Sequence, residues 1–134
     1  MTQESRLSIA LLFMRLSVFL VMLMWTLDKF INPQHASAVY EGFYFIKGVG
    51  PGLLTLIGSL ELVVLVAFVV GYQKKWTYGA VLLFHAVSTL SSYQQYFAPY
   101  TGPNLLFFAA WPMLAACYAL FTLREFDTRW AIEK

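Results

Sequence analysis

The stretch LSIALLFMRLSVFLVMLMWTL, residues 7–27, decides the fold, because it is mainly apolar and carries one charged residue, Arg15. A helix that crosses the hydrocarbon core of a bilayer needs about 20 mainly apolar residues. The apolar core of a secretory signal is shorter, about 7 to 15 residues, and is followed by a small-residue cleavage site that is missing here. We therefore expect a retained transmembrane helix.

The whole chain has the composition of a membrane protein. Of its 134 residues, 60% are hydrophobic and 12% are charged, whereas soluble domains are about half apolar and a quarter charged. Three more apolar stretches of bilayer-matching length follow, at residues 53–71, 76–97 and 104–123. The sequence predicts an all-α membrane protein, in which residues 1–134 form a single four-transmembrane-helix bundle without a soluble catalytic domain.

The segments between the spans predict how the helices are connected. Gln73, Lys74 and Lys75 form a tight polar turn, so the second and third helices should be antiparallel neighbours. The sequence APYTGPN, residues 98–104, predicts another turn, with Asn104 as a candidate N-cap. Residues 34–52 are too short to span and rich in aromatics, which favours a short interfacial or re-entrant helical segment between helices 1 and 2. An ordered aromatic loop remains the alternative.

The distribution of basic residues predicts the orientation, because Lys and Arg in short loops favour the cytoplasmic side. Four spans place both termini on one side, together with most of the basic residues: Arg6, Lys74, Lys75, Arg124, Arg129 and Lys134. The other side carries Lys29 and Lys47. We therefore expect a multi-pass protein with both termini in the cytoplasm.

Charge and cysteine content exclude several classes of function. The net charge is +2 and the basic residues are scattered, so nucleic-acid binding is not expected. Cys117 is the single cysteine and lies in an apolar run, which excludes a disulfide framework and a CxxC redox pair. No cysteine or second histidine stands at a ligand spacing from His85, so we expect no metal site.

Three ionisable residues are predicted to lie at similar depth in the membrane. At a rise of 1.5 Å per residue, Arg15 lies about 12 Å, Glu61 about 18 Å and His85 about 13–14 Å from the cytoplasmic boundary. Each charge at the helix centre costs about 2.5–3.5 kcal/mol, so such groups need partners. We expect Arg15 to pair with Glu61, with His85 hydrogen-bonded to the same carboxylate. A ligand site and an ion pair that only fixes helix packing both fit.

A polar stripe on the third helix extends from this layer toward the outer side. His85, Ser88 or Thr89, Ser92, and Gln95 or Tyr96 recur at helical spacing. They predict an outward-opening polar cleft with His85 at its floor, although Ser88, Thr89 and Ser92 also suit close helix packing. The candidate ligand-binding residues are Arg15, Glu61, His85, Ser92, Gln95 and Tyr96, and the candidate catalytic residues are Glu61 and His85.

Several short motifs resemble the DoxX/DoxD family. They are Arg15 in the first helix, LDKFINP at residues 27–33, and GSLE at residues 58–61 followed by Gly71. The resemblance covers nearly the whole chain and implies a small four-helix protein of the bacterial inner membrane. Some members of the family are associated with thiosulfate:quinone oxidoreductase or with thiol-stress complexes, so the resemblance also implies a membrane subunit that meets a quinone or an oxidised small molecule.

The leading hypothesis is a membrane subunit of a redox or respiratory assembly. Arg15 would supply a fixed positive charge to a quinone head or small anion, and Glu61 and His85 would handle protons. The sequence has no cofactor-binding motif, so a redox protein partner would be needed. Two alternatives remain: a non-enzymatic assembly factor or scaffold that docks a partner through residues 40–45, and a small-solute or proton pathway. Homo-oligomerisation also remains open.

Overall fold

The computed structural model describes residues 1–133, and the elements in this range are all helices. Lys134, one of the expected cytoplasmic cations, lies outside the described residues. In chain order the elements are α1 (Gln3–Ile31), α2 (Pro33–Phe43), α3 (Pro51–Val69), α4 (Lys74–Ser91), α5 (Tyr93–Tyr96), the 3-10 helix η1 (Asn104–Ala109), α6 (Ala110–Thr122) and the 3-10 helix η2 (Arg124–Phe126).

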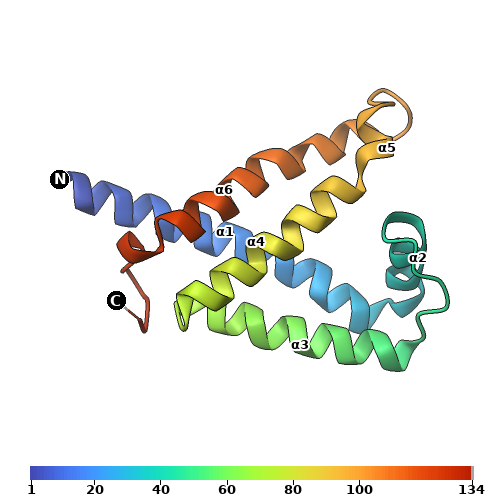
Figure 1. Ribbon diagram of the computed structural model, residues 1–134, viewed down its shortest axis with the longest axis horizontal. Coiled ribbons are helices and arrows are strands. Elements are labelled where there is room, and N and C mark those ends of the chain that lie inside the picture. The colour runs from blue at the N-terminus through green and yellow to red at the C-terminus, as the bar shows by residue number, and fades with distance from the viewer. Residues whose placement is uncertain (134) are drawn as a thin grey trace.

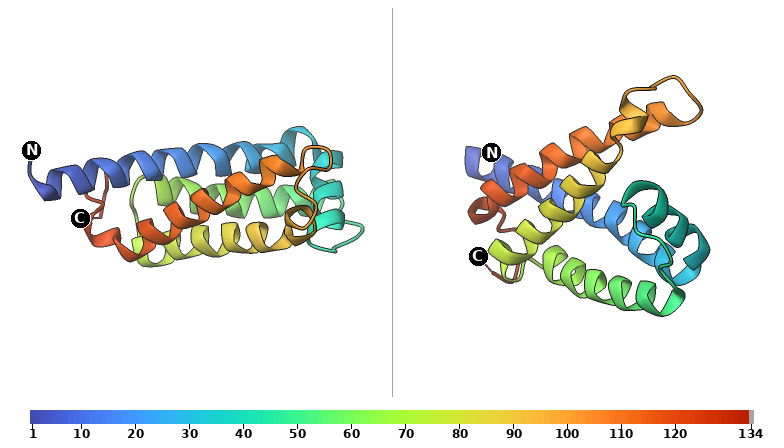
Figure 2. Two further views of the ribbon diagram at one scale, coloured as in Figure 1. Left: turned by 90° about the horizontal axis from the view of Figure 1, so that it is seen from above. Right: turned by 45° about the vertical axis from the view of Figure 1, so that its right-hand side comes forward.

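The long helices form two pairs (Figure 1). Helix α1 packs against α3, α4 packs against α6, and a tight turn joins α3 to α4. Both termini lie at one end of the molecule, which we call the proximal end, and α2 and α5 lie at the opposite, distal end. The two pairs approach each other proximally and diverge distally, as a second direction of view also shows (Figure 2).

Three helical stretches are long and apolar enough to cross a membrane: Gln3–Ile31, Pro51–Val69 and Asn104–Thr122. Because all the described elements are helices, the predicted all-α fold is confirmed. The three apolar helices are those expected of a membrane protein. Large apolar side chains on these helices point away from the bundle, for example Phe13, Leu60, Val63 and Leu106. Such an exposed apolar surface is expected of a protein surrounded by lipid.

Local signals explain where the first two helices begin and end. Thr2 caps α1 by accepting a hydrogen bond from the Ser5 amide at 3.1 Å, so α1 begins at Gln3, four residues before the predicted span. The helix ends at Ile31, and Pro33 opens α2 at the position where a missing N–H is tolerated. The predicted helical segment between the first two spans is confirmed as α2, whereas residues 44–50 are not helical.

The last two predicted spans are less regular than expected. The helix predicted at residues 76–97 is broken at Ser92, where α4 ends and the short α5 begins. Asn104 is not an N-cap, because its side-chain amide donates to the Ala98 carbonyl at 2.9 Å. The chain changes from 3-10 to α geometry at Ala110, just before Pro112, which cannot donate a backbone hydrogen bond.

The main core lies between the two helix pairs. It consists of buried side chains from α1, α3, α4 and α6: Leu11, Val18, Leu65, Phe68, Tyr78, Val81, Cys117 and Leu120. The Phe68 and Tyr78 rings meet edge to face at 5.0 Å between centroids. A smaller distal cluster of Ala36, Val49 and Leu54 holds α2 against α3. The core positions two separate groups of polar side chains, one at each end.

Candidate functional site

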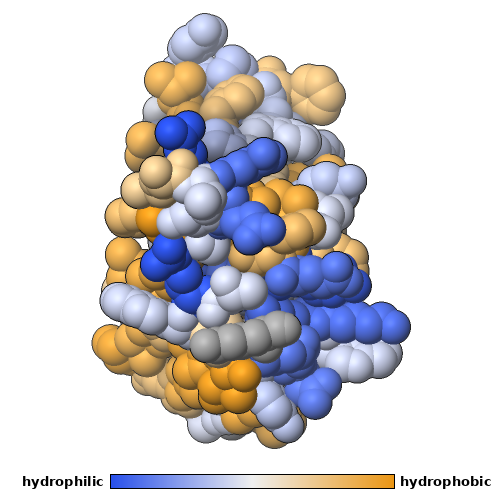
Figure 3. Space-filling view, turned by 90° about the vertical axis from the view of Figure 1, so that its left-hand side faces the viewer, coloured by the Kyte–Doolittle hydropathy of each residue, from blue (hydrophilic) through white to orange (hydrophobic). Residues whose placement is uncertain are grey.

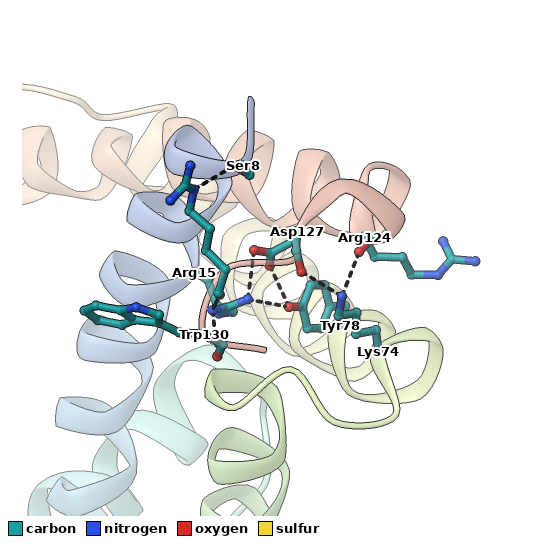
Figure 4. Close-up of polar contacts among 8 residues, drawn as sticks. Ser8, Arg15, Lys74, Tyr78, Arg124, Asp127 and Trp130 are labelled. Atoms are coloured by element: carbon teal, nitrogen blue, oxygen red, sulfur yellow. Dashed lines mark hydrogen bonds and ion pairs between the residues drawn. The ribbon is translucent and has the colours of Figure 1, made fainter. Parts of the chain in front are cut away.

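Arg15 is the centre of a buried polar cluster at the proximal end (Figure 4). Its Nη1 lies 2.8 Å from Oδ1 of Asp127, and both side chains are 0% exposed. Nη1 also donates to the Tyr78 hydroxyl at 3.3 Å, and Tyr78 in turn donates to Asp127 Oδ2 at 2.6 Å. The other terminal nitrogen, Nη2, donates to the backbone carbonyls of Arg129 and Trp130. Arg15 thus joins α1 and α4 to the end of the chain.

Residues 127–133, which we call the C-terminal segment, are bound across the proximal end. The Arg129 guanidinium donates to Ser8 Oγ at 2.8 Å and to Ser5 Oγ at 2.9 Å. Further along, the Ile132 amide donates to the Val70 carbonyl at 2.8 Å, and the Glu133 amide donates to the Gly71 carbonyl at 3.0 Å. Viewed onto this end, hydrophilic side chains gather beside an apolar margin (Figure 3).

Lys74 completes the proximal cluster from the first turn of α4. Its Nζ donates to the backbone carbonyls of Arg124 at 3.1 Å and Asp127 at 2.7 Å, and the residue is 2% exposed. Because Arg15, Lys74 and Asp127 are almost completely buried and bind atoms of this chain, the cluster is best explained as a structural connection.

The predicted ion pair between Arg15 and Glu61 is wrong, because Arg15 pairs with Asp127 and Glu61 pairs with Lys29. Arg15 contacts Tyr78, one turn after α4 begins, and so lies near the proximal end, not at the depth of Glu61. Asp127 had no predicted role. One signal in the sequence could have identified it: Asp127 is an acid that follows the last apolar stretch on the side where Arg15 needs a partner.

Glu61 belongs to a second cluster, at the distal end. Its Oε2 lies 3.0 Å from Lys29 Nζ and accepts a hydrogen bond from Thr26 Oγ1 at 3.0 Å. Lys29 Nζ also lies 5.8 Å from the centroid of the Tyr40 ring of α2. Burial, and after it the charge of Glu61, raises the pKa of Tyr40. The side chains of Lys29 and Glu61 are 12% and 22% exposed, so this cluster, unlike that of Arg15, is partly accessible.

His85 does not join either cluster. Its Nε2 lies 2.9 Å from the backbone carbonyl of Ala110, which links α4 to α6, and its own carbonyl accepts a hydrogen bond from Thr89 Oγ1 at 2.7 Å. Within residues 1–133 no hydrogen bond connects His85 to Glu61. The predicted single layer of Arg15, Glu61 and His85 is therefore replaced by three separate environments.

The His85 contact gives a prediction that separates a structural from a proton-handling role. His85→Leu should lower the free energy of unfolding by about 1–3 kcal/mol, because the Ala110 carbonyl loses this donor and a buried polar group is replaced. His85→Gln retains an N–H donor and should recover much of this loss. Unfolding in detergent is monitored through the reaction of the single, buried Cys117 with a thiol-reactive dye, because this thiol becomes accessible when the protein unfolds. Equal stability of the two variants would contradict the structural role.

The polar stripe on α4 is used mainly for local bonding. Ser92 Oγ donates to the Ser88 carbonyl at 3.3 Å, and the Tyr96 hydroxyl donates to the Thr89 carbonyl at 2.8 Å. Gln95 is partly buried, and its Oε1 has no hydrogen-bond partner among the described residues. Ser88 differs, because its Oγ lies 2.6 Å from the hydroxyl of Tyr44, beyond the end of α2. The stripe therefore reinforces the distal end of α4, and Ser88 connects it to the α2 segment.

The distal end also has a small open cavity of about 210 Å³, lined by Met24, Trp25, Asp28 and His35. His35 Nδ1 lies 2.6 Å from Asp28 Oδ2, and the His35 ring stacks on Trp25 at 6.2 Å between centroids. This cavity lies at the junction of α1 and α2, so it is not the predicted cleft with His85 at its floor. Residues 1–133 contain no group of three or more His, Cys, Asp or Glu side chains placed to hold a metal ion.

No protein-family model, curated protein or solved structure matches this chain. The resemblance to the DoxX/DoxD family therefore stays a prediction. Any function has to be inferred from the polar side chains themselves. Lys29 and Glu61 of the distal cluster are partly exposed, whereas Arg15 and Asp127 of the proximal cluster are fully buried.

Proposed function

We propose that the chain is a bacterial inner-membrane protein with four spans, in which α4 crosses the membrane together with the three long apolar stretches. Helix α4 packs beside both α3 and α6, and its 18 residues extend about 27 Å at 1.5 Å per residue. From residue 76 to residue 123 the chain has no Asp, Glu, Lys or Arg. This charge-free interval favours a hairpin embedded in lipid, with the proximal end, both termini and most of the basic residues on the cytoplasmic side.

We further propose that the distal cluster of Thr26, Lys29, Tyr40 and Glu61 binds the head of a quinone or a similar small amphipathic molecule. The observation that carries this proposal is the partly exposed Lys29–Glu61 pair between apolar helices. Lys29 and Tyr40 supply hydrogen-bond donors for a quinone carbonyl, and Glu61 supplies a carboxylate that can take up or release a proton. Ligand pockets commonly combine such a small polar group with apolar walls.

In this proposal the chain is the membrane subunit of a redox or respiratory assembly. Its own residues bind and orient the quinone and exchange protons with it. Electrons come from a protein partner, because the side chains of the distal cluster have no means of carrying them. The buried cluster of Arg15 and Asp127 has a different task, which is to hold the C-terminal segment and the proximal helix ends together.

In the experiment, the purified protein in lipid nanodiscs is titrated with a short-chain ubiquinone analogue. Binding is measured as the quenching of tryptophan fluorescence. Glu61→Gln and Lys29→Met should each weaken binding about tenfold or more, because each removes one member of the Lys29–Glu61 pair. Glu41→Gln is the matched control, since Glu41 is an exposed carboxylate on α2. Absence of binding by the unmodified protein, or equal binding by Glu61→Gln, would overturn the proposal.

A further inference from the structure

Helix α2 lies over the distal cluster. Tyr40, near its C-terminal end, places its ring centroid 5.8 Å from Lys29 Nζ, the atom that pairs with Glu61. Thr26, which donates to Glu61, is 1% exposed. The side chains of Lys29 and Glu61 are only 12% and 22% exposed, so a ligand that contacts both needs more of their surface than this closed arrangement exposes. How a ligand enters the distal cluster is a question that rests on the proposed function, binding of a small amphipathic molecule at this cluster.

The two ends of α2 are held differently. At its N-terminal end α2 follows α1 after a single residue, Asn32, and the contact between His35 and Asp28 ties its first turn to α1. At its C-terminal end comes a non-helical loop, residues 44–50, with left-handed backbone at Phe45 (φ 59°) and Gly48 (φ 74°). A side-chain carbon added at Gly48 would meet no atom within 4 Å. Gly48 thus faces open space. Val49, next to it, is 5% exposed and packs with Ala36 in the first turn of α2, so the N-terminal half of α2 is the fixed half.

Two contacts join the C-terminal end of α2 to the other helix pair. The Tyr44 hydroxyl and Ser88 Oγ of α4 form a hydrogen bond at 2.6 Å. The Phe43 ring lies 5.7 Å from the ring of Phe107 in η1, measured between centroids. These contacts connect the two pairs at the end where they diverge (Figure 1). Opening has to break this hydrogen bond, this aromatic pair and the packing of Tyr40 against Lys29 and the Ala36 cluster. The first two are weak enough to break and re-form during ligand entry.

We propose that α2 is a lid over the distal cluster, hinged at Asn32 and closed by the bond between Tyr44 and Ser88. Opening moves the C-terminal end of α2 away from α4 and gives a small amphipathic molecule access to Lys29 and Glu61. Closing returns Tyr40 to the site and excludes lipid and water from it. Local opening of this kind occurs in segments that make few contacts with the rest of the protein.

The test measures access to the covered site without any ligand. Thr26→Cys is placed in a Cys117→Ala background, and its reaction with a sulfonated maleimide is timed in nanodiscs. Tyr44→Phe removes the hydroxyl that closes the lid, so labelling should become about three- to tenfold faster. Ser88→Ala should have the same effect. The double variant should be no faster than either single one, because both changes remove one bond.

Tyr100→Phe is the matched control, because Tyr100 lies at the distal end and is 89% exposed. It should leave the labelling rate unchanged. The lid is overturned if Tyr44→Phe labels no faster than Tyr100→Phe. It is also overturned if Thr26→Cys alone reacts as fast as Glu41→Cys, which places the thiol at an exposed position. Since no quinone is present, this result is independent of whether a quinone binds. If quinone does bind, Tyr44→Phe should raise its association and dissociation rates together.

Discussion

Asp127→Ala is expected to lower the free energy of unfolding by about 3–5 kcal/mol, because it leaves the guanidinium of Arg15 buried without its anion. The same change removes the acceptor of the Tyr78 hydroxyl. The loss should appear as a large decrease in the detergent concentration, or temperature, at which the buried Cys117 becomes reactive.

Two further variants show whether the loss comes from the buried charge. Glu125→Gln, which neutralises an exposed acid two residues earlier in the chain, should change the free energy by less than about 0.5 kcal/mol. Arg15→Met combined with Asp127→Leu should be more stable than Asp127→Ala alone, because no unpaired charge is left from the pair. If Asp127→Ala and Glu125→Gln were equally stable, Asp127 would not be the partner that holds Arg15.

Gly71→Ala should also lower the free energy of unfolding strongly, because it introduces both backbone strain and a steric clash. Gly71 has φ +69°, a conformation that costs other residues about 1–2 kcal/mol. An added Cβ would also lie 2.6 Å from the Cβ and 3.0 Å from the Cα of Ala131, so the C-terminal segment would have to move, at about 1–3 kcal/mol. We expect a combined loss of about 2–5 kcal/mol, measured by the same Cys117 reactivity.

Gly102→Ala separates the two costs. Gly102 has φ +52°, but a Cβ added there would meet no atom within 4 Å. Its loss should therefore come from the backbone alone, about 1–2 kcal/mol. Trypsin cleavage near Arg129 should become faster in Gly71→Ala and stay unchanged in Gly102→Ala, because only the first change displaces the C-terminal segment. Equal stability and equal cleavage of the two variants would contradict the contact between Gly71 and Ala131.

Much of the fold could be predicted from the sequence. The long apolar stretches predicted the long helices, the Gln73–Lys75 turn predicted the α3–α4 hairpin, and the aromatic stretch after Pro33 predicted α2. The boundaries were less predictable, since the cap at Thr2 and the break at Ser92 depend on single hydrogen bonds and not on apolar length. Hydrophobic length specifies that a segment is helical, and local bonding specifies where it ends.

The candidate site was predicted only in part. Their position inside apolar stretches marked Arg15, Glu61 and His85 as residues that need polar partners, and each has one in the structure. It could not give the partners, because depth says nothing about rotation of a helix about its axis or about the path of the C-terminal segment. Lys29 and Asp127, which carry the opposite charges, lie at or beyond the ends of the predicted spans, where a charge needs no partner.

The sequence by itself indicated that this protein lies in lipid and that its apolar segments are helical. Both follow from the free energy of placing apolar side chains in water and unpaired backbone groups in lipid, which is a sum over single residues. The pairing of charges was decided only by the tertiary structure. Arg15 finds Asp127, far along the chain, and Glu61 finds Lys29, because packing of α1 on α3 and α4 on α6 brings these side chains within hydrogen-bonding distance. The interaction of two charges depends on their distance in space, and the sequence of a single segment does not specify its distance from another segment.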